Sequence, residues 1–439
     1  MIKKLQIFIF LLPLVLSAQY ELSGNFAPAK DFDFVIVYKV QADRLVYLIN
    51  GKVDKDGNIS LPLNEKAFPG VYQVVYELPE EENNFTFIFN GKENINFSFS
   101  REEGVRFLGG QNKIIEDYLM EMEGVQMEIE MALTENKPQK TIKNLIEKQK
   151  SIQQKAESKA DPFVQKYLKA IKPFIPEKFE NKEAYLIYKK SLFFDNFNFL
   201  DPDLQNTPFA LQLLKEYYHE FVTKQGGNNY KETIDDIVRQ IKVADKAYQK
   251  NLLTNFWQYL YKGQRSNAAN YLASSYLISL AKDQHDPGLA ENLERIKNTS
   301  VGSIAPNFNL KNFDSDKTFH DLNDSDFYLL IFWSTECSHC MAQIPQIYAE
   351  LKDIPQEKLQ VVAVGLEVED MVWKQKAKEF GNFINVLALD QWRDDIVKSY
   401  DVRATPTFFI LDNNKQILSR PRGKENLMTI IEAIKNYQE

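Results

Sequence analysis

The chain has 439 residues, of which 44% are hydrophobic, 13% aromatic and 26% charged, and its formal net charge is −8. This composition argues against wholesale disorder, and the length exceeds the ~250–300 residues that one hydrophobic core usually serves, so two or three domains are expected. The acidic balance argues against a nucleic-acid partner, because phosphate binding needs a concentrated basic face.

Residues 1–18 have the order of an export signal. Two lysines precede an apolar run from residue 5 to residue 16, and the small residues Ser17 and Ala18 follow it. The run is too short to cross a ~30 Å hydrocarbon core comfortably, and the order of basic, apolar and small segments is typical of a secretory signal peptide. We expect cleavage after Ala18 and a location in the periplasm or cell envelope; an uncleaved anchor is the alternative.

Residues 19–109 alternate apolar and polar side chains in short runs such as FVIVYKV and NFTFIFNG. Turn formers separate these runs, including Asp56-Gly57 and Asn90-Gly91. Alternation with a period of two between such turns is typical of antiparallel strands joined by tight hairpins. The sequence therefore predicts an N-terminal antiparallel β-sandwich domain.

Residues 110–298 contain long segments with an apolar period near 3.6, among them NKIIEDYLMEMEGVQMEIEMAL and YKETIDDIVRQIKVA. This period predicts an all-helical central domain, and the lack of a fixed repeat length disfavours a helical-repeat solenoid. Prolines lack an N–H group and are expected at helix starts or in loops. They are Pro138, Pro162, Pro173, Pro176, Pro202, Pro208 and Pro287.

Residues 299–439 alternate strand and helix patterns. A strand at 327–333 precedes a helix at 342–352, a second strand at 359–368 follows, and the region ends with a hairpin at 407–419 and a helix. Such alternation predicts parallel core strands with helices on both faces, and the hairpin adds antiparallel edge strands. The whole chain is thus expected to be an α+β multidomain protein.

Cys337 and Cys340 are the only cysteines, and they lie where the first strand of this C-terminal region becomes a helix. A bridge between them closes a loop too short to add much stability. The positive end of a helix lowers the pKa of a thiol from ~8.5 toward ~3.5–7.5, which produces a nucleophilic thiolate. We expect Cys337 to attack a disulfide of a client protein and Cys340 to resolve the mixed disulfide.

Two neighbours are expected to tune the pair in opposite directions. A protonated His339 would stabilise the Cys337 thiolate, whereas the charge of Glu336 would destabilise it unless that side chain points to water. Metal binding is the rival interpretation of the pair. A structural zinc site needs four donors, and the four histidines of the chain are dispersed, so neither a metal nor another cofactor is expected.

The C-terminal region resembles the thioredoxin-like superfamily, most closely the exported TlpA-type thiol-disulfide oxidoreductases, in the multidomain form of Bacteroidetes-type bacteria. The resemblance covers residues 301–437. It is carried by APNFNL, by LLIFWSTECSHC with Trp333 four residues before Cys337, by VVAVGLE, by YDVRATPTFFILD and by the closing Gly423. This order of motifs is far more specific than the cysteine pair alone.

The resemblance implies several site residues. Pro406 is expected to be a cis proline beside the cysteines, and the backbone of Thr405 to pair with an extended substrate strand. Trp333 and His339 are expected to help bind the substrate. Glu367 is a candidate to accept the proton of the resolving thiol, although a solvated carboxylate at the strand end is the alternative interpretation.

Two departures from the family pattern leave the direction of electron flow open. Glu336 stands where relatives often have tryptophan, and His339 stands where they often have proline. We expect a reductant or an isomerase-like factor rather than a primary oxidant. Its partners would be client proteins with cysteines or disulfides, and a second thiol or disulfide partner for electron exchange, with membrane-bound proteins among the candidates.

Two other functions remain as alternatives. A peroxiredoxin-like peroxidase needs a proline seven residues and a threonine or serine three residues before its nucleophile, and these places hold Leu330 and Ser334. A non-catalytic scaffold would use the thioredoxin-like module only for docking. Such a module has no chemical need for both sulfurs, and both are present.

Overall fold

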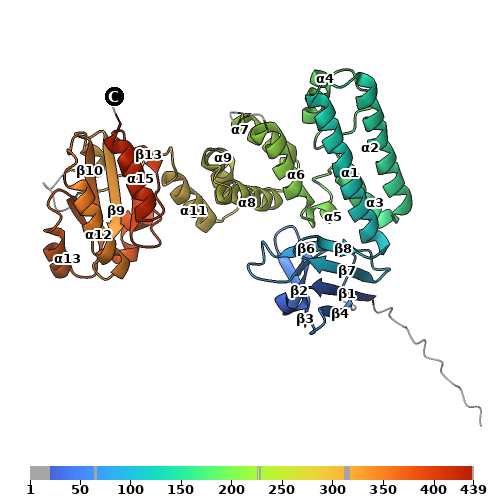
Figure 1. The fold of residues 1–439 in the computed structure, drawn as a ribbon, viewed down its shortest axis with the longest axis horizontal. Coiled ribbons are helices and arrows are strands. Elements are labelled where there is room, and N and C mark those ends of the chain that lie inside the picture. Colours follow the sequence, from blue (N-terminus) through green and yellow to red (C-terminus); the bar gives the residue numbers. More distant parts are fainter. Residues whose placement is uncertain (1–19, 64–66, 225, 227–228, 311–316, 438–439) are drawn as a thin grey trace, which may run out of the picture. The chain divides into compact units, whose positions relative to one another are not determined.

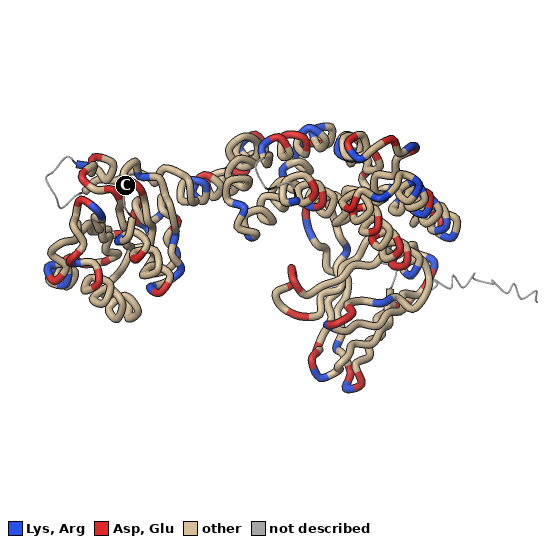
Figure 2. The backbone as a smooth tube through the Cα atoms, turned by 45° about the horizontal axis from the view of Figure 1, so that its top comes forward, with Lys and Arg blue, Asp and Glu red and all other residues tan. Residues whose placement is uncertain are grey.

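The computed structural model describes residues 20–63, 67–224, 226, 229–310 and 317–437 (Figure 1). The predicted signal peptide, residues 1–18, lies outside the described residues. By its internal contacts the chain divides into two compact units, one ending at Leu252 and one beginning at Leu253. Among the described helices, none is long and apolar enough to cross a lipid bilayer. Lys and Arg alternate with Asp and Glu along both units (Figure 2).

The first unit begins with two four-stranded sheets, whose strand orders are β4-β1-β7-β8 and β3-β2-β5-β6. Inward-facing apolar residues of both sheets, such as Phe26 of one and Val37 of the other, share one core, so the predicted sandwich is confirmed. The strands are β1 (Tyr20–Ala27), β2 (Phe34–Val40), β3 (Leu45–Lys52), β4 (Asn58–Leu63), β5 (Gly70–Val75), β6 (Asn84–Phe89), β7 (Ile95–Ser100) and β8 (Gly104–Phe107), with a short helix η1 (Ala29–Asp31).

Two details of the predicted sandwich are wrong. The sandwich is not wholly antiparallel, because β1 pairs with β7 in parallel. The turns at Asp56-Gly57 and Asn90-Gly91 do not close hairpins within a sheet, since they join β3 to β4 and β6 to β7, and each of these pairs is split between the two sheets. Both turns therefore carry the chain across the core.

The helical segment follows directly. Three of its helices begin with an Asp-Pro pair, and the carboxylates of Asp161, Asp201 and Asp286 each accept a backbone N–H of the first turn. The predicted placement of prolines at helix starts is confirmed there. The elements are α1 (Gly110–Thr134), α2 (Gln139–Lys159), α3 (Pro162–Ala170), α4 (Lys182–Ser191), α5 (Pro202–Gln205), α6 (Phe209–Tyr218), η2 (His219–Thr223), α7 (Tyr230–Ile241), α8 (Lys246–Lys262), α9 (Ser266–Leu272), η3 (Ala273–Leu277), α10 (Ile278–Asp283) and α11 (Pro287–Asn298).

The second unit contains a five-stranded sheet with the order β11-β10-β9-β12-β13. Strands β9, β10 and β11 are parallel, and β12 and β13 are antiparallel, as the strand and helix alternation predicts. The elements are η4 (Phe319–Asp321), β9 (Phe327–Trp333), α12 (Ser338–Leu351), β10 (Leu359–Leu366), α13 (Asp370–Ala377), β11 (Ile384–Ala388), η5 (Gln391–Arg393), α14 (Asp395–Ser399), β12 (Thr407–Asp412), β13 (Ile417–Ser419) and α15 (Lys424–Lys435).

Alternate residues of β9 build two separate cores, one on each face of this sheet. Leu329, Ile331 and Trp333 pack with α12, α13 and α15. Leu330 and Phe332 point to the other face, where they pack with α14 and with apolar residues from the segment before β9. Burial on both faces explains why β9 is apolar throughout, as parallel strands in the middle of a sheet usually are.

Candidate active site

The cysteines lie at the edge of the sheet where the parallel strands end. The carboxyl ends of β9, β10 and β11 share this edge, and the antiparallel strand β12 begins there. Consequently the turn with Cys337, the residue Glu367 after β10, and Thr405-Pro406 before β12 come together although they are far apart in the sequence. Such edges are the usual place for functional sites in open α/β sheets.

Cys337 is the N-cap residue of α12. Its Sγ accepts a hydrogen bond from the backbone N–H of Cys340 at 3.1 Å. Cys337 is partly exposed, whereas Cys340, in the first turn of the helix, is fully buried. The helix begins at Ser338, four residues earlier than the sequence pattern predicts, so both cysteines lie within its first turn and its N-cap.

The two thiols have opposite pKa shifts. Burial acts to raise the pKa of Cys337, but hydrogen bonds from the Cys340 thiol and from the backbone N–H groups of Cys340 and His339 outweigh burial and lower it. Burial, together with the neighbouring Cys337 sulfur, raises the pKa of Cys340 to about 12. At neutral pH the exposed sulfur is therefore the better nucleophile, and the buried sulfur keeps its proton.

Thr405-Pro406 lies beside the exposed sulfur. The peptide bond between Thr405 and Pro406 is cis, as the resemblance implies. The Cys337 thiol donates a hydrogen bond to the Thr405 carbonyl oxygen at 3.3 Å. Both residues are partly exposed, so a visiting polypeptide has access to their backbone.

Glu367 is buried, with an exposed fraction of 3%, and the alternative of a solvated strand-end carboxylate is wrong. Its Oε1 accepts the backbone N–H of Thr335 at 2.6 Å, and its Oε2 accepts the Thr335 hydroxyl at 2.8 Å. Burial raises the pKa of this carboxyl group. Ser334, the residue before Thr335, makes a backbone hydrogen bond with the Cys340 thiol. The Glu367 carboxylate and the buried thiol therefore contact adjacent residues of one turn.

Trp333 has no exposed surface and does not fit the expected contact with a substrate. It ends β9, and its ring packs edge-on against Phe380 with the ring centroids 5.8 Å apart. Trp333 and Cys340 belong to the same hydrophobic core, on the face of the sheet that α12, α13 and α15 cover. The tryptophan was misassigned because alternation along a strand buried on both faces gives no sign of which residue reaches the surface.

His339 and Glu336 both lie on the surface of the cysteine turn. Glu336 does not simply point to water, because its Oε2 accepts a hydrogen bond from Gln391 Nε2 at 3.3 Å. Gln391 belongs to η5, which follows β11. The cysteine turn is thus joined to the loop of the outermost parallel strand.

An ion cluster around Asp401 escaped the sequence analysis. Asp401 is buried, and its Oδ1 accepts hydrogen bonds from Arg295 Nε at 2.9 Å and Arg403 Nε at 3.1 Å. Arg420 donates to the Asp401 carbonyl oxygen at 3.2 Å. The cluster holds the start of the segment that carries Thr405. The only signal in the sequence is an aspartate four residues before Thr405, which is too common a feature to be recognised.

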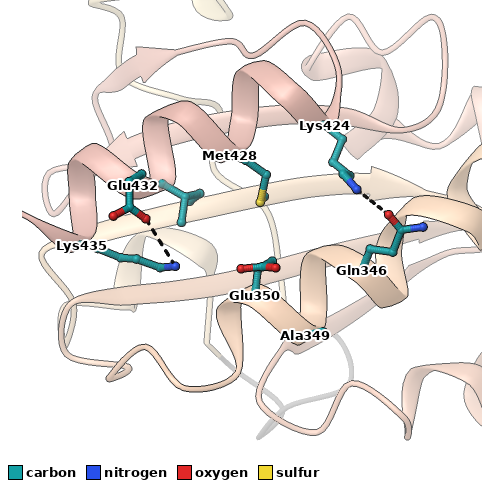
Figure 3. Close-up of a pocket in the computed structure, with 8 residues that line it drawn as sticks. Gln346, Ala349, Glu350, Lys424, Met428, Glu432 and Lys435 are labelled. Atoms are coloured by element: carbon teal, nitrogen blue, oxygen red, sulfur yellow. Dashed lines mark hydrogen bonds and ion pairs between the residues drawn. The ribbon is translucent and has the colours of Figure 1, made fainter.

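A groove lies between α12 and α15 in this unit (Figure 3). Two of its charged side chains already have partners within it, since Lys424 donates to Gln346 and Lys435 pairs with Glu432. None of its eight lining residues is a cysteine or a histidine. Over the residues that the structure describes, no group of three or more His, Cys, Asp or Glu side chains could hold a metal ion.

Comparison with known proteins agrees with this geometry. Residues 301–420 match the family model described as the AhpC/TSA family. The thiol-disulfide oxidoreductase ResA of Geobacillus thermodenitrificans is 30% identical over 142 residues, which cover 31% of this chain and 79% of ResA. The chain belongs to the thiol-disulfide oxidoreductase family. ResA of Geobacillus kaustophilus is 28% identical over 143 residues, again 31% of this chain and 79% of the relative.

Two solved structures are similar to this chain at lower identity. The thioredoxin domain of a thiol-disulfide oxidoreductase from Bacteroides vulgatus is 20% identical, with a TM-score of 0.28, and covers 31% of this chain and 99% of its own. A thioredoxin-like protein from Bacteroides caccae is 20% identical, with a TM-score of 0.38, and covers 61% of this chain and 98% of its own. The family model and the ResA relatives confirm the predicted resemblance to thioredoxin-like thiol-disulfide oxidoreductases.

Proposed function

We propose that this thiol-disulfide oxidoreductase is a TlpA-like enzyme that exchanges disulfides with client proteins through Cys337 and Cys340. The observation that carries the proposal is the placement of the two thiols: Cys337 is partly exposed at the N-cap of α12 with its sulfur 3.3 Å from the Thr405 carbonyl oxygen, whereas Cys340 is buried. A pair used for a static staple or for docking alone needs no such difference.

In the reducing direction the steps are as follows. The Cys337 thiolate attacks one sulfur of a client disulfide, a bond forms between these two sulfurs, and the other client sulfur leaves as a thiolate. Cys340 then loses its proton and attacks Cys337, which releases the second client thiolate. Two electrons pass to the client, and the pair is left as a disulfide.

Cys340 needs a proton acceptor because its pKa lies far above neutral. Glu367 is the candidate, since it is buried and bonded to Thr335 beside the turn residue that contacts the Cys340 thiol. Burial raises the pKa of this carboxyl group and so makes it a better proton acceptor near neutral pH. Thr405, whose carbonyl lies 3.3 Å from Cys337 Sγ, would pair with the client backbone next to the reacting sulfur, with Pro406 beside it.

The wider setting of the reaction is also part of the proposal. The signal-like order of residues 1–18 supports a location in the periplasm or cell envelope. A second protein with a reduced pair of thiols would then restore the reduced Cys337–Cys340 pair after each turnover and would itself be left as a disulfide. His339, exposed at the helix start, would contact the client or tune the thiolate.

The peroxidase alternative is less favoured by the geometry. The position seven residues before Cys337 holds Leu330, which is fully buried within β9. The position three residues before it holds Ser334, which is also buried. Neither residue presents a group to a peroxide beside the exposed sulfur.

The test is reduction of insulin disulfides by the full-length protein in the presence of dithiothreitol. Cys337→Ser is expected to reduce activity to the uncatalysed rate, because the attacking sulfur is lost. Cys340→Ser is expected to accumulate a mixed disulfide between Cys337 and insulin, recoverable after an acid quench. Unchanged activity of Cys337→Ser would exclude the mechanism, and a mixed disulfide that forms on Cys340 in Cys337→Ser would reverse the assigned order.

A further inference from the structure

Two connections at the active edge of the sheet expose large apolar side chains: the first loop, taken here to include the first turn of α13, and the second loop, which includes η5. Val368, Met371 and Val372 follow β10, and Leu389 and Trp392 follow β11. Their exposed fractions range from 49% for Trp392 to 77% for Met371. Single exposed apolar residues are ordinary, but a group of this size on neighbouring loops marks an interaction surface. We refer to these five residues as the apolar patch.

The two loops are neighbours, and both are joined to the cysteine turn. The backbone N–H of Glu367 donates to the carbonyl of Ala388 at 3.0 Å, which holds the loops side by side. The Glu367 carboxylate accepts hydrogen bonds from Thr335, two residues before Cys337. Gln391, which lies between the two apolar residues of the second loop, donates to Glu336. The two segments that carry the apolar patch are therefore joined to each other and to the turn of the reactive sulfur.

Carboxylates surround the apolar patch. Glu336 of the cysteine turn, Glu369 of the first loop, and Asp390 and Asp395 of the second are all exposed. The exposed cations of the same segments are Lys374, which pairs with Asp370, Lys378, Arg393, and Lys398, which pairs with Asp395, so Glu336, Glu369 and Asp390 are the carboxylates that give the margin its acidic character. The surface beside Cys337 is consequently apolar at its centre and acidic at its margin, which complements a ligand that is apolar and positively charged.

We propose that the apolar patch binds the client polypeptide next to its disulfide, and that the preferred segment combines large apolar residues with Lys or Arg. The inference rests on the proposed function, because that reaction brings a client sulfur against Cys337. An extended chain rises about 3.3 Å per residue, so a few residues beyond the client cysteine span the distance to such a neighbouring surface. The large apolar residues of such a segment are usually buried in folded proteins, so the client class is polypeptides that are unfolded or not yet folded.

The experiment uses the full-length reduced protein and three peptides of equal length, each with one internal disulfide. The residues flanking the disulfide are Leu and Lys in the first peptide, Ser and Lys in the second, and Leu and Glu in the third. We expect kcat/KM for the first peptide to exceed that for the others by about tenfold, which corresponds to ~1.4 kcal/mol. Raising the salt concentration should reduce the preference of Lys over Glu.

The matched variants are Met371→Ser combined with Trp392→Ser, and Met127→Ser as the control. Met127 lies on α1 and is 61% exposed, so its loss removes a similar apolar surface away from the two loops. The double variant is expected to lose the preference for Leu over Ser, whereas the control keeps it. Glutathione disulfide, which is too small to reach the apolar patch, should react equally with all three proteins.

The outcomes separate the two proposals. Equal rates for the three peptides, or an unaltered preference in the double variant, would overturn docking at the apolar patch while exchange with glutathione disulfide upheld the proposed function. Loss of exchange with glutathione disulfide as well as with every peptide would contradict the proposed function itself. A second copy of the chain or a lipid vesicle bound at the apolar patch, released by the double variant, would overturn the client assignment.

Discussion

The two β-rich regions of the chain share one packing feature, a strand glycine covered by an aromatic ring, but the feature has different consequences in each. In the N-terminal sandwich, Gly24 of β1 lies beneath the ring of Phe97, its partner on the parallel strand β7. In the C-terminal sheet, Gly365 of β10 lies beneath the indole of Trp373 from α13. A Cβ atom at either glycine would overlap the ring that covers it. Each strand therefore keeps a glycine so that a large aromatic side chain can approach its backbone.

The consequences of this feature differ between the two regions. Phe97 belongs to the core between the two sheets of the sandwich, and Gly24 lies against its ring. Gly365 lies two residues before Glu367, and Trp373 lies on α13 directly after Met371 and Val372 of the apolar patch. We therefore expect packing in the C-terminal sheet to affect the position of the reactive groups, and packing in the sandwich to affect the stability of the fold.

Among the substitutions that test the difference between the two regions, Glu367→Gln is expected to have the largest effect on disulfide exchange. Glu367→Gln keeps an acceptor for the N–H of Thr335 but has no proton acceptor for Cys340, so turnover should fall about a hundredfold. The first attack by Cys337, measured by alkylation, should be unchanged. Glu116→Gln is the matched control, because the Glu116 carboxylate also accepts a backbone N–H, that of Phe107, at 2.9 Å.

The same variant has a pH signature in its stability. Burial raises the pKa of Glu367, so its ionisation costs free energy in the folded protein but not in the unfolded chain. The contribution of Glu367 to the free energy of unfolding of the wild-type protein is fully present at acid pH. It is lost as the pH rises through the raised pKa of the folded protein. Glu367→Gln is therefore expected to resist urea better than wild type at neutral pH and equally at pH ~4. A loss of activity in Glu116→Gln that is greater than the loss in Glu367→Gln would contradict the proposed contrast between the N-terminal sandwich and the C-terminal sheet.

The paired glycine variants test the contrast directly. Gly24→Ala and Gly365→Ala are each expected to lower the free energy of unfolding by about 1–3 kcal/mol, because a methyl group must displace a packed ring. Only Gly365→Ala should also slow disulfide exchange, by about tenfold, since displacement of Trp373 moves groups near the site. Activity is measured well below the unfolding transition of each variant. Equal losses of exchange in both variants would show that the sandwich also positions the site.

Sequence patterns predicted the C-terminal region best. The apolar strand at 327–333, the helix dipole at Cys337 and the nearby Thr405-Pro406 follow from local rules or from family motifs, and all three are placed as expected. In the sandwich, the direction of β1 against β7 was missed, because these strands are separated by some seventy residues and no turn links them. Local turn chemistry at Asp56-Gly57 likewise cannot reveal which sheet the next strand joins.

The burial of particular side chains and the long-range ion pairs could not be predicted from the sequence either. The pattern could not show that Glu367 is buried, since a charged residue at the end of a strand is usually solvated. It also placed Trp333 at the substrate, although both faces of β9 are covered. The contact of Arg295 with Asp401 joins residues that are more than a hundred positions apart, and no local rule predicts such a pair.

The smallest effect is expected at Arg295, which acts on the site only through Asp401. Arg295 Nε lies 2.9 Å from Asp401 Oδ1, and its guanidinium also donates to Asn292 at 2.8 Å. In Arg295→Gln the segment leading to Thr405 loses one of its anchors, because Arg403 alone then pairs with the buried carboxylate. Since Thr405 would bind the client backbone, KM for insulin should rise about threefold, while kcat and the reaction with glutathione disulfide stay unchanged.

Arg239→Gln is the matched control, since Arg239 forms a comparable ion pair with Asp236 at 2.8 Å on α7. Both variants lose a partly exposed ion pair, so similar small changes in stability are expected. A rise in KM restricted to Arg295→Gln identifies Arg295 as a positioning residue for the client-binding segment. An equal rise in both variants, or a fall in kcat with glutathione disulfide, would instead mean that the loss of Arg295 acts through general loosening of the fold.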